Sequence, residues 1–130
     1  MTFSNSFNRK YMKESIVATK SFEFAIRVVN TYKFLSSEKK EYVLSKQLLR
    51  SGTSIGAMIR EAEHAESKAD FLHKMSIALK EANESGYWIF LLFKGGYIKD
   101  SQFLSLNKDN CEIIKLLASI VKTIKVNLGK

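Results

Sequence analysis

The chain has 130 residues, of which 45% are hydrophobic and 26% charged, and its formal net charge is +8. This balance predicts one globular domain over residues 1–130, and the absence of proline favours long helices over short strands and turns. No apolar run could span a bilayer, no signal peptide is recognisable, and a lone Cys111 fits a reducing compartment, so we expect a cytoplasmic protein without a membrane partner.

Four amphipathic helices are predicted, at about 14–35, 39–64, 68–94 and 107–128, because apolar residues recur along each at steps of three and four. Ser36-Ser37 precedes the second helix, Ser67 can cap the third, Gly95-Gly96 ends it, and Asn107 can cap the fourth. Short connections make successive helices antiparallel neighbours. The predicted fold class is all-α, an antiparallel up-down-up-down four-helix bundle whose last helix returns beside the first. The expected core positions are Val17, Phe24, Ala25, Val28, Val29, Tyr32, Leu35, Leu44, Leu48, Ile55, Ile59, Ala62, Phe71, Met75, Ala78, Leu79, Ala82, Ile89, Phe93, Ile113, Leu117, Ile120, Val121, Ile124 and Leu128.

The second helix contains an unusual stretch, LLRSGTSIGAMIREAEHA, with two glycines and several polar residues near its middle. Gly52 and Gly56 have no side chain and should let a neighbouring backbone approach the helix closely. A polar row lies beside the core stripe at steps of three and four: Gln47, Arg50, Ser54 and Glu61. We expect Arg50 to find a carboxylate partner, Glu81 or Glu84, on the third helix. The alternative is that Arg50 and Glu61 are half-exposed and contribute little.

These residues resemble a family of four-helix-bundle proteins that are often encoded in intervening sequences of bacterial 23S ribosomal RNA genes. The residues that match the family pattern are Gln47, Arg50, Ser54, Ile55, Ile59, Glu61, Phe71, Ile77 and Ala78. Met58 departs from it, because the family usually has Asn there. The resemblance implies a closed homo-oligomer, a pentameric ring, without catalysis. A similar barrel-forming protein accompanies the reverse transcriptases of diversity-generating retroelements, where it is thought to bind nucleic acid.

The third helix has an additional row of residues outside its core stripe: Ile77, Glu81, Glu84, Trp88 and Leu91. Near its end, GYWIFLLF is apolar on every side, and a helix that is apolar all round must be covered all round. One bundle core cannot cover two sides of a helix, so we expect this row to form an oligomer interface. The alternative is that residues 95–106 fold back over Trp88.

Basic residues are concentrated at the two ends of the chain and spaced by seven. Lys13, Lys20 and Arg27 follow one another along the first helix, and Lys108, Lys115 and Lys122 along the fourth. Both lines are expected to point away from the core on one side of the bundle, where they would attract phosphate backbones. No aromatic residues are interleaved with them, so binding would be mainly electrostatic, with RNA favoured. The alternative is that these are ordinary solvating lysines.

No enzyme chemistry is predicted, and no catalytic residue, metal or cofactor. Glu61-x-x-His64 and Asp70-x-x-His73 have the spacing of di-iron bundle ligands, but the outer helices lack inward-facing glutamates to complete such a site. Two functions therefore compete. The first is a homo-oligomeric nucleic-acid-binding protein, and the second is a protein-interaction scaffold whose charge serves solubility.

Overall fold

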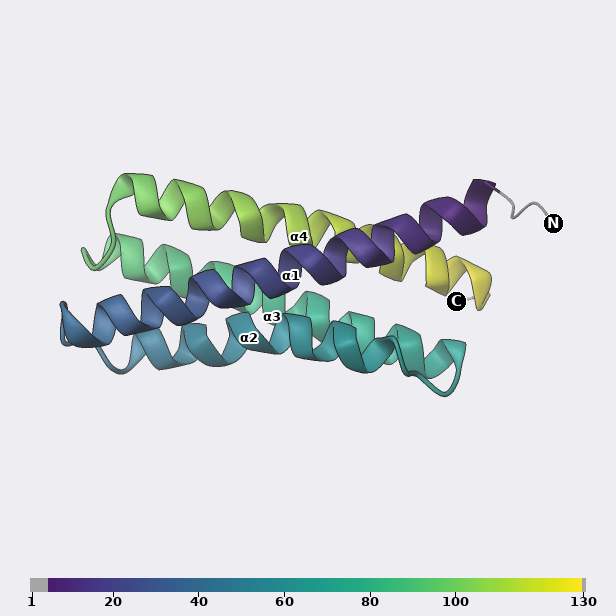
Figure 1. The fold of residues 1–130 in the computed structure, drawn as a ribbon, viewed down its shortest axis with the longest axis horizontal. Helices are drawn as coiled ribbons and strands as arrows, with labels where there is room; N and C mark the ends of the chain where they lie inside the picture. Colours follow the sequence, from purple (N-terminus) through teal and green to yellow (C-terminus); the bar gives the residue numbers. More distant parts are fainter. Residues whose placement is uncertain (1–4, 130) are drawn as a thin grey trace.

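The computed structural model describes residues 5–129, with side chains from Lys13 onward, and contains four long helices that run back and forth along one axis (Figure 1). They are α1 (Asn5–Ser37), α2 (Leu44–Ala62), α3 (Lys68–Lys94) and α4 (Asp100–Asn127). Each helix packs on the next, and α4 returns beside α1. The predicted antiparallel up-down-up-down four-helix bundle is confirmed. None of the described helices is long and apolar enough to cross a membrane.

The boundaries of α3 agree with the sequence prediction. The Ser67 side chain accepts a hydrogen bond from the Asp70 backbone N–H at 3.0 Å, which caps the first turn. At the other end Gly95 follows the last helical residue, and Gly96 takes a left-handed conformation with φ of 84°. The helix begins and ends where its capping residues predict.

The second helix begins at Leu44 rather than near residue 39, because Glu41 caps it from upstream. The buried Glu41 carboxylate accepts hydrogen bonds from the backbone N–H groups of Val43, Leu44 and Ser45 at 3.1, 3.1 and 2.7 Å. Burial raises the pKa of this carboxyl group, but the three backbone hydrogen bonds outweigh burial, and its pKa lies below the ordinary value. Ser36 and Ser37, which were expected between the first two helices, are the last residues of α1.

The outer helices are longer than predicted. The first begins at Asn5, not near residue 14. The fourth begins at Asp100, so Asn107 is an internal helical residue and not a cap. The Lys99 backbone N–H donates to Gln102 Oε1 at 2.8 Å, which fixes this earlier start. Most of the segment 95–106 is therefore the beginning of α4, and its Phe103 ring stacks on Phe93, with 4.5 Å between the ring centroids.

The core is built from all four helices and contains most of the predicted positions. The buried apolar residues are Val17, Phe24, Val28, Leu35, Leu48, Ile55, Ile59, Ala62, Leu72, Met75, Ala78, Ala82, Ile89, Leu92, Ile98, Leu106, Ile113, Leu117, Ile120, Val121 and Ile124. Five further predicted positions are partly buried and pack against this core: Leu44, Phe71, Leu79, Phe93 and Leu128. Ala25, Val29 and Tyr32 are partly buried and lie outside the core cluster, which is less than predicted. Several polar side chains are buried among the apolar ones, and Asn110 Nδ2 donates to the Ala82 carbonyl at 2.9 Å, which ties α4 to α3.

Candidate functional site

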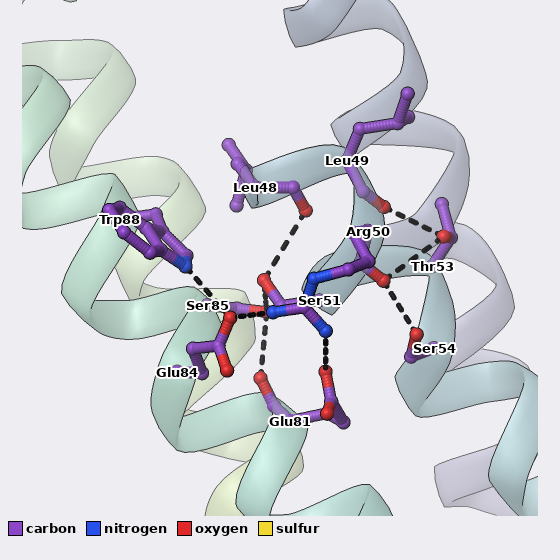
Figure 2. A network of polar contacts seen from close by, with 10 residues as sticks. All are labelled: Leu48, Leu49, Arg50, Ser51, Thr53, Ser54, Glu81, Glu84, Ser85 and Trp88. Atoms are coloured by element: carbon purple, nitrogen blue, oxygen red, sulfur yellow. Dashed lines mark hydrogen bonds and ion pairs between the residues drawn. The ribbon is translucent and has the colours of Figure 1, made fainter. Parts of the chain in front are cut away.

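Arg50 on α2 forms an ion-paired network with α3, as the sequence predicts (Figure 2). Its Nη1 lies 3.2 Å from Glu81 Oε2, and its Nη2 pairs with Glu84 Oε2. Trp88 Nε1 donates to the same Glu84 oxygen at 3.0 Å. The Arg50 side chain is 51% exposed, whereas Glu81 is 14% and Glu84 30% exposed. The carboxylates are therefore held close to the protein, and the guanidinium closes the network on the solvent side.

Two buried hydroxyl groups lie next to this network, at the contact between α2 and α3 (Figure 2). The Oγ atoms of Ser51 and Ser85 are 3.0 Å apart, and both residues are fully buried. Ser85 Oγ also lies 2.9 Å from the Glu81 carbonyl on its own helix. One hydroxyl donates to the other, and a backbone carbonyl accepts the remaining proton. The two helices can therefore approach at small side chains without leaving a buried donor unpaired.

The polar row of α2 and the additional row of α3 are joined by the Arg50 network, and we call the two rows together the α2–α3 strip. Besides the Arg50 network, Glu61 pairs with Lys74 at 3.2 Å and Ser54 Oγ donates to the Arg50 carbonyl at 2.6 Å. Ile77 and Leu91 are partly buried and do not join the core cluster. The strip comprises Gln47, Arg50, Ser54, Glu61, Ile77, Glu81, Glu84, Trp88 and Leu91. Two groups of residues that the sequence singled out for separate reasons thus lie together.

The basic line of α1 does not point away from the core, and this expectation is wrong. Lys20 stands three residues after Val17 and four before Phe24, both buried, so it flanks the core stripe on the α4 side. It pairs with Glu112 at 2.9 Å, and the hydrogen bond and charge of Glu112 raise the pKa of Lys20.

The other two members of the α1 line also face α4. Arg27 Nη1 pairs with Asp109 at 2.5 Å, while its Nη2 donates to Ser105 Oγ at 2.8 Å. Lys13 Nζ donates to Ser119 Oγ at 2.7 Å and so has a neutral partner. The line therefore joins α1 to α4, and only Lys13 keeps an uncompensated charge there.

The basic line of α4 does point outward. Lys115 stands two residues from both Ile113 and Leu117, which places it about 200° around the helix from each buried side chain. Lys108 and Lys122 continue the line at one heptad on either side, and all three side chains are exposed. Among the residues that the structure describes, no carboxylate lies within ion-pair distance of these three. We call them the α4 lysine line.

A further line on α3 was not recognised in the sequence. His73, Lys80, Tyr87 and Lys94 are seven residues apart, and all four are exposed. The spacing of seven is visible in the sequence, but a search for lines of lysine and arginine misses it, because two of the four residues are His73 and Tyr87. The acidic residues of α3 and α4 mostly face other helices, since Glu81 and Glu84 pair with Arg50. Asp109 and Glu112 likewise pair with α1. The outer surface of α3 and α4 is therefore left positively charged.

No group of three His, Cys, Asp or Glu side chains suited to holding a metal ion occurs within the described part of the chain. His64 and His73 are exposed, and so is Cys111. The polar groups that converge are those of the α2–α3 strip and of the contact between α1 and α4.

The arrangement of helices and of the Arg50 network can be compared with known proteins. The family model described as 23S rRNA-intervening sequence protein matches residues 13–119. The chain belongs to the 23S rRNA-intervening sequence protein family. A crystal structure of a protein with unknown function from the S23 ribosomal protein family of Bacteroides thetaiotaomicron VPI-5482 has 61% sequence identity to this family member and a TM-score of 0.84. The match covers 85% of this chain and 98% of that chain. No curated protein matches the sequence.

Proposed function

We propose that this protein is a non-catalytic homo-oligomer, a pentameric ring, that binds nucleic acid electrostatically through the outer surfaces of its bundles. The observation that carries the proposal is the α4 lysine line. Lys108, Lys115 and Lys122 are exposed, regularly spaced and uncompensated, while the acidic neighbours Asp109 and Glu112 are engaged with α1. Such a line raises the local concentration of polyanions and releases counterions when phosphates bind.

The α1 line contributes less to this surface than its sequence suggests. Lys20 and Arg27 are neutralised by Glu112 and Asp109, so of the three residues in this line only Lys13 adds positive charge beside α4. Their proposed role is to hold α1 against α4, which orients the α4 lysine line. RNA is the polymer we favour, because the family is described by its relation to 23S rRNA.

Homo-oligomerisation is supported by the α2–α3 strip, in which Ile77, Trp88 and Leu91 lie beside the polar network without being fully buried. Repeating the bundle around a ring would repeat the α4 lysine line, and several copies of a weak electrostatic site bind a long polyanion more tightly than one. The proposed ring therefore strengthens the proposed binding.

Salt-dependent binding of RNA by the purified protein tests the proposal. The logarithm of the affinity should fall linearly with the logarithm of salt concentration, with a slope of about 0.7–0.9 per neutralised phosphate. Lys115→Glu with Lys122→Glu should flatten this slope and weaken binding to all sequences alike. The matched control is Lys33→Glu with Lys46→Glu, an equal charge change at exposed positions on α1 and α2. Equal losses in both double variants would show that net charge alone acts.

A third variant separates the two basic lines. Lys20→Gln with Arg27→Gln removes two cations from the contact with α4, so it should lower thermal stability more than it lowers RNA affinity. A loss of affinity equal to that of the α4 double variant, at unchanged stability, would restore the α1 line as a binding surface.

The second candidate function is a protein-interaction scaffold. One observation favours it: Phe22 and Ile26 lie one turn apart on α1 and are 64% and 48% exposed. A protein that fails to retain RNA or DNA even at low salt would leave this scaffold as the better explanation.

A further inference from the structure

The exposed line on α3 places an aromatic ring between two lysines. Tyr87 stands two residues from the buried Ser85 and Ile89, so its side chain points away from the core, and it is 60% exposed. Lys80 precedes it and Lys94 follows it by seven residues, about two helical turns each way. No aromatic residue is interleaved with the α1 and α4 lines, as noted from the sequence, whereas the α3 line contains Tyr87.

A second exposed ring lies next to the first. Phe90 is 49% exposed, and the ammonium group of Lys94 is 5.6 Å from the centre of its ring. Phe90 packs against Phe103 of α4, with ring centroids 5.9 Å apart. Tyr87 is supported by Trp88, whose ring meets it edge-on with 5.1 Å between centroids. Both exposed rings are thus held in place by a second aromatic ring, which lowers the entropy cost of stacking a ligand on them.

The charge around these rings is positive. Glu81 and Glu84, the nearest acidic residues on α3, are ion-paired with Arg50, and Glu84 also accepts a hydrogen bond from Trp88. On the neighbouring α4, Lys108 and Lys115 are exposed. A hydrophobic partner protein of ordinary composition gains nothing from lysines on both sides of its contact. A polyanion that carries flat apolar groups matches both features.

We propose that the α3 line binds unpaired nucleotides of single-stranded RNA. Bases stack on Tyr87 and Phe90, and Lys80 and Lys94 bind the flanking phosphates. This inference rests on the proposed function and names its substrate class, because base-paired RNA offers no free base face to these rings. Stacking tolerates every base, so the site prefers single strands without reading a sequence.

Three RNA ligands separate the contribution of base stacking from that of phosphate binding. They are a short single strand, the same strand with abasic sugars, and the same strand in a blunt duplex. Stacking on one ring is worth about 1–3 kcal/mol, so the wild-type protein should bind the base-bearing strand at least about fivefold more tightly than the abasic strand. Tyr87→Ala should remove most of this preference. Affinity for the abasic strand and the duplex should stay unchanged, because these ligands use the lysines alone.

The matched control is Phe22→Ala, which removes an equally exposed aromatic ring from α1 and should leave the preference intact. Phe90→Leu, which keeps an apolar side chain against Phe103, should reduce the preference without lowering thermal stability. Trp88, the single tryptophan, adjoins Tyr87, so its fluorescence should change on addition of the base-bearing strand and not of the abasic one.

Three results would overturn the inference. Equal binding of the base-bearing and abasic strands, with the α4 lysines still required, would refute stacking and leave the proposed function standing. A lower oligomer mass in Tyr87→Ala would show that this ring is an interface between copies. Absence of binding to all three ligands would remove the proposed function and this inference together.

Discussion

Gly52 on α2 faces Val28 on α1 so closely that an added Cβ atom would lie 2.8 Å from Val28 Cγ2 and 2.9 Å from Cγ1. Gly52 therefore lies at a close approach of the two helices, which explains a glycine in mid-helix. Gly56, one turn later, is different: an added Cβ would meet Ser21 at 3.5 Å, an ordinary contact distance.

Gly52→Ala should destabilise the protein. Alanine gains about 1 kcal/mol of helix propensity, but overpacking against a buried, β-branched valine costs about 1–3 kcal/mol. Gly56→Ala gains the same propensity without the clash and should be neutral or stabilising. Chemical denaturation of the two variants measures the difference. A Gly52→Ala protein as stable as Gly56→Ala would show that the helices can move apart freely.

Arg50→Ala should destabilise more than Arg60→Ala, because Arg50 links two carboxylates and Arg60 is exposed without an ion pair among the described residues. Since the Arg50 side chain is half-exposed, we expect a loss near the upper end of the range for surface pairs, about 1 kcal/mol. Removing the cation also leaves Glu81 and Glu84 facing each other as like charges. Thermal unfolding of both variants at low and high salt tests this, and equal small effects would make Arg50 an ordinary surface residue.

Glu41 should make stability depend on pH. Its pKa is lower in the folded protein than in the unfolded chain, so its stabilising effect is fully present above the unfolded pKa and is lost as pH falls through the folded pKa. At pH 7, Glu41→Ala should lose about 1 kcal/mol, the usual worth of a helix cap. The difference from wild type should shrink below about pH 5. Glu38→Ala, at an exposed position in the same connection, is the control.

Leu91→Glu should lower the oligomer mass. Leu91 belongs to the α2–α3 strip and does not join the core, so a charge there should spare the fold and oppose burial against a second copy. Light scattering should give several times 14.8 kDa for the wild type and less for the variant. Leu104→Glu, the same change at an exposed position on α4, should keep the wild-type mass. A wild-type monomer would refute the proposed ring.

The sequence predicted elements best where capping residues adjoin the apolar pattern, as Ser67 and Gly95 do at α3. The predicted start of α2 was wrong because its cap, Glu41, stands three residues before the first helical residue. The orientation of Lys20 was misjudged because Ala25 and Val29 were counted as core. When these half-buried residues are included, the side of α1 that faces the core is placed too far around the helix from Lys20. Val17, three residues before Lys20, and Phe24, four residues after it, are buried and show that Lys20 borders the core. Which helix covers a half-buried side chain depends on packing, which periodicity alone does not contain.

The contact between α1 and α4 has a consequence for folding. It joins residues separated by 78 to 106 positions, and its named hydrogen bonds and ion pairs lie at the surface or are only part-buried. The other three helix contacts are between neighbours in the chain and can form as local hairpins at small loop-closure cost. We therefore expect the α1–α4 edge to close last during folding and to open first. Amide hydrogens on that side of the bundle should then exchange through local opening while the α2–α3 hairpin is still protected.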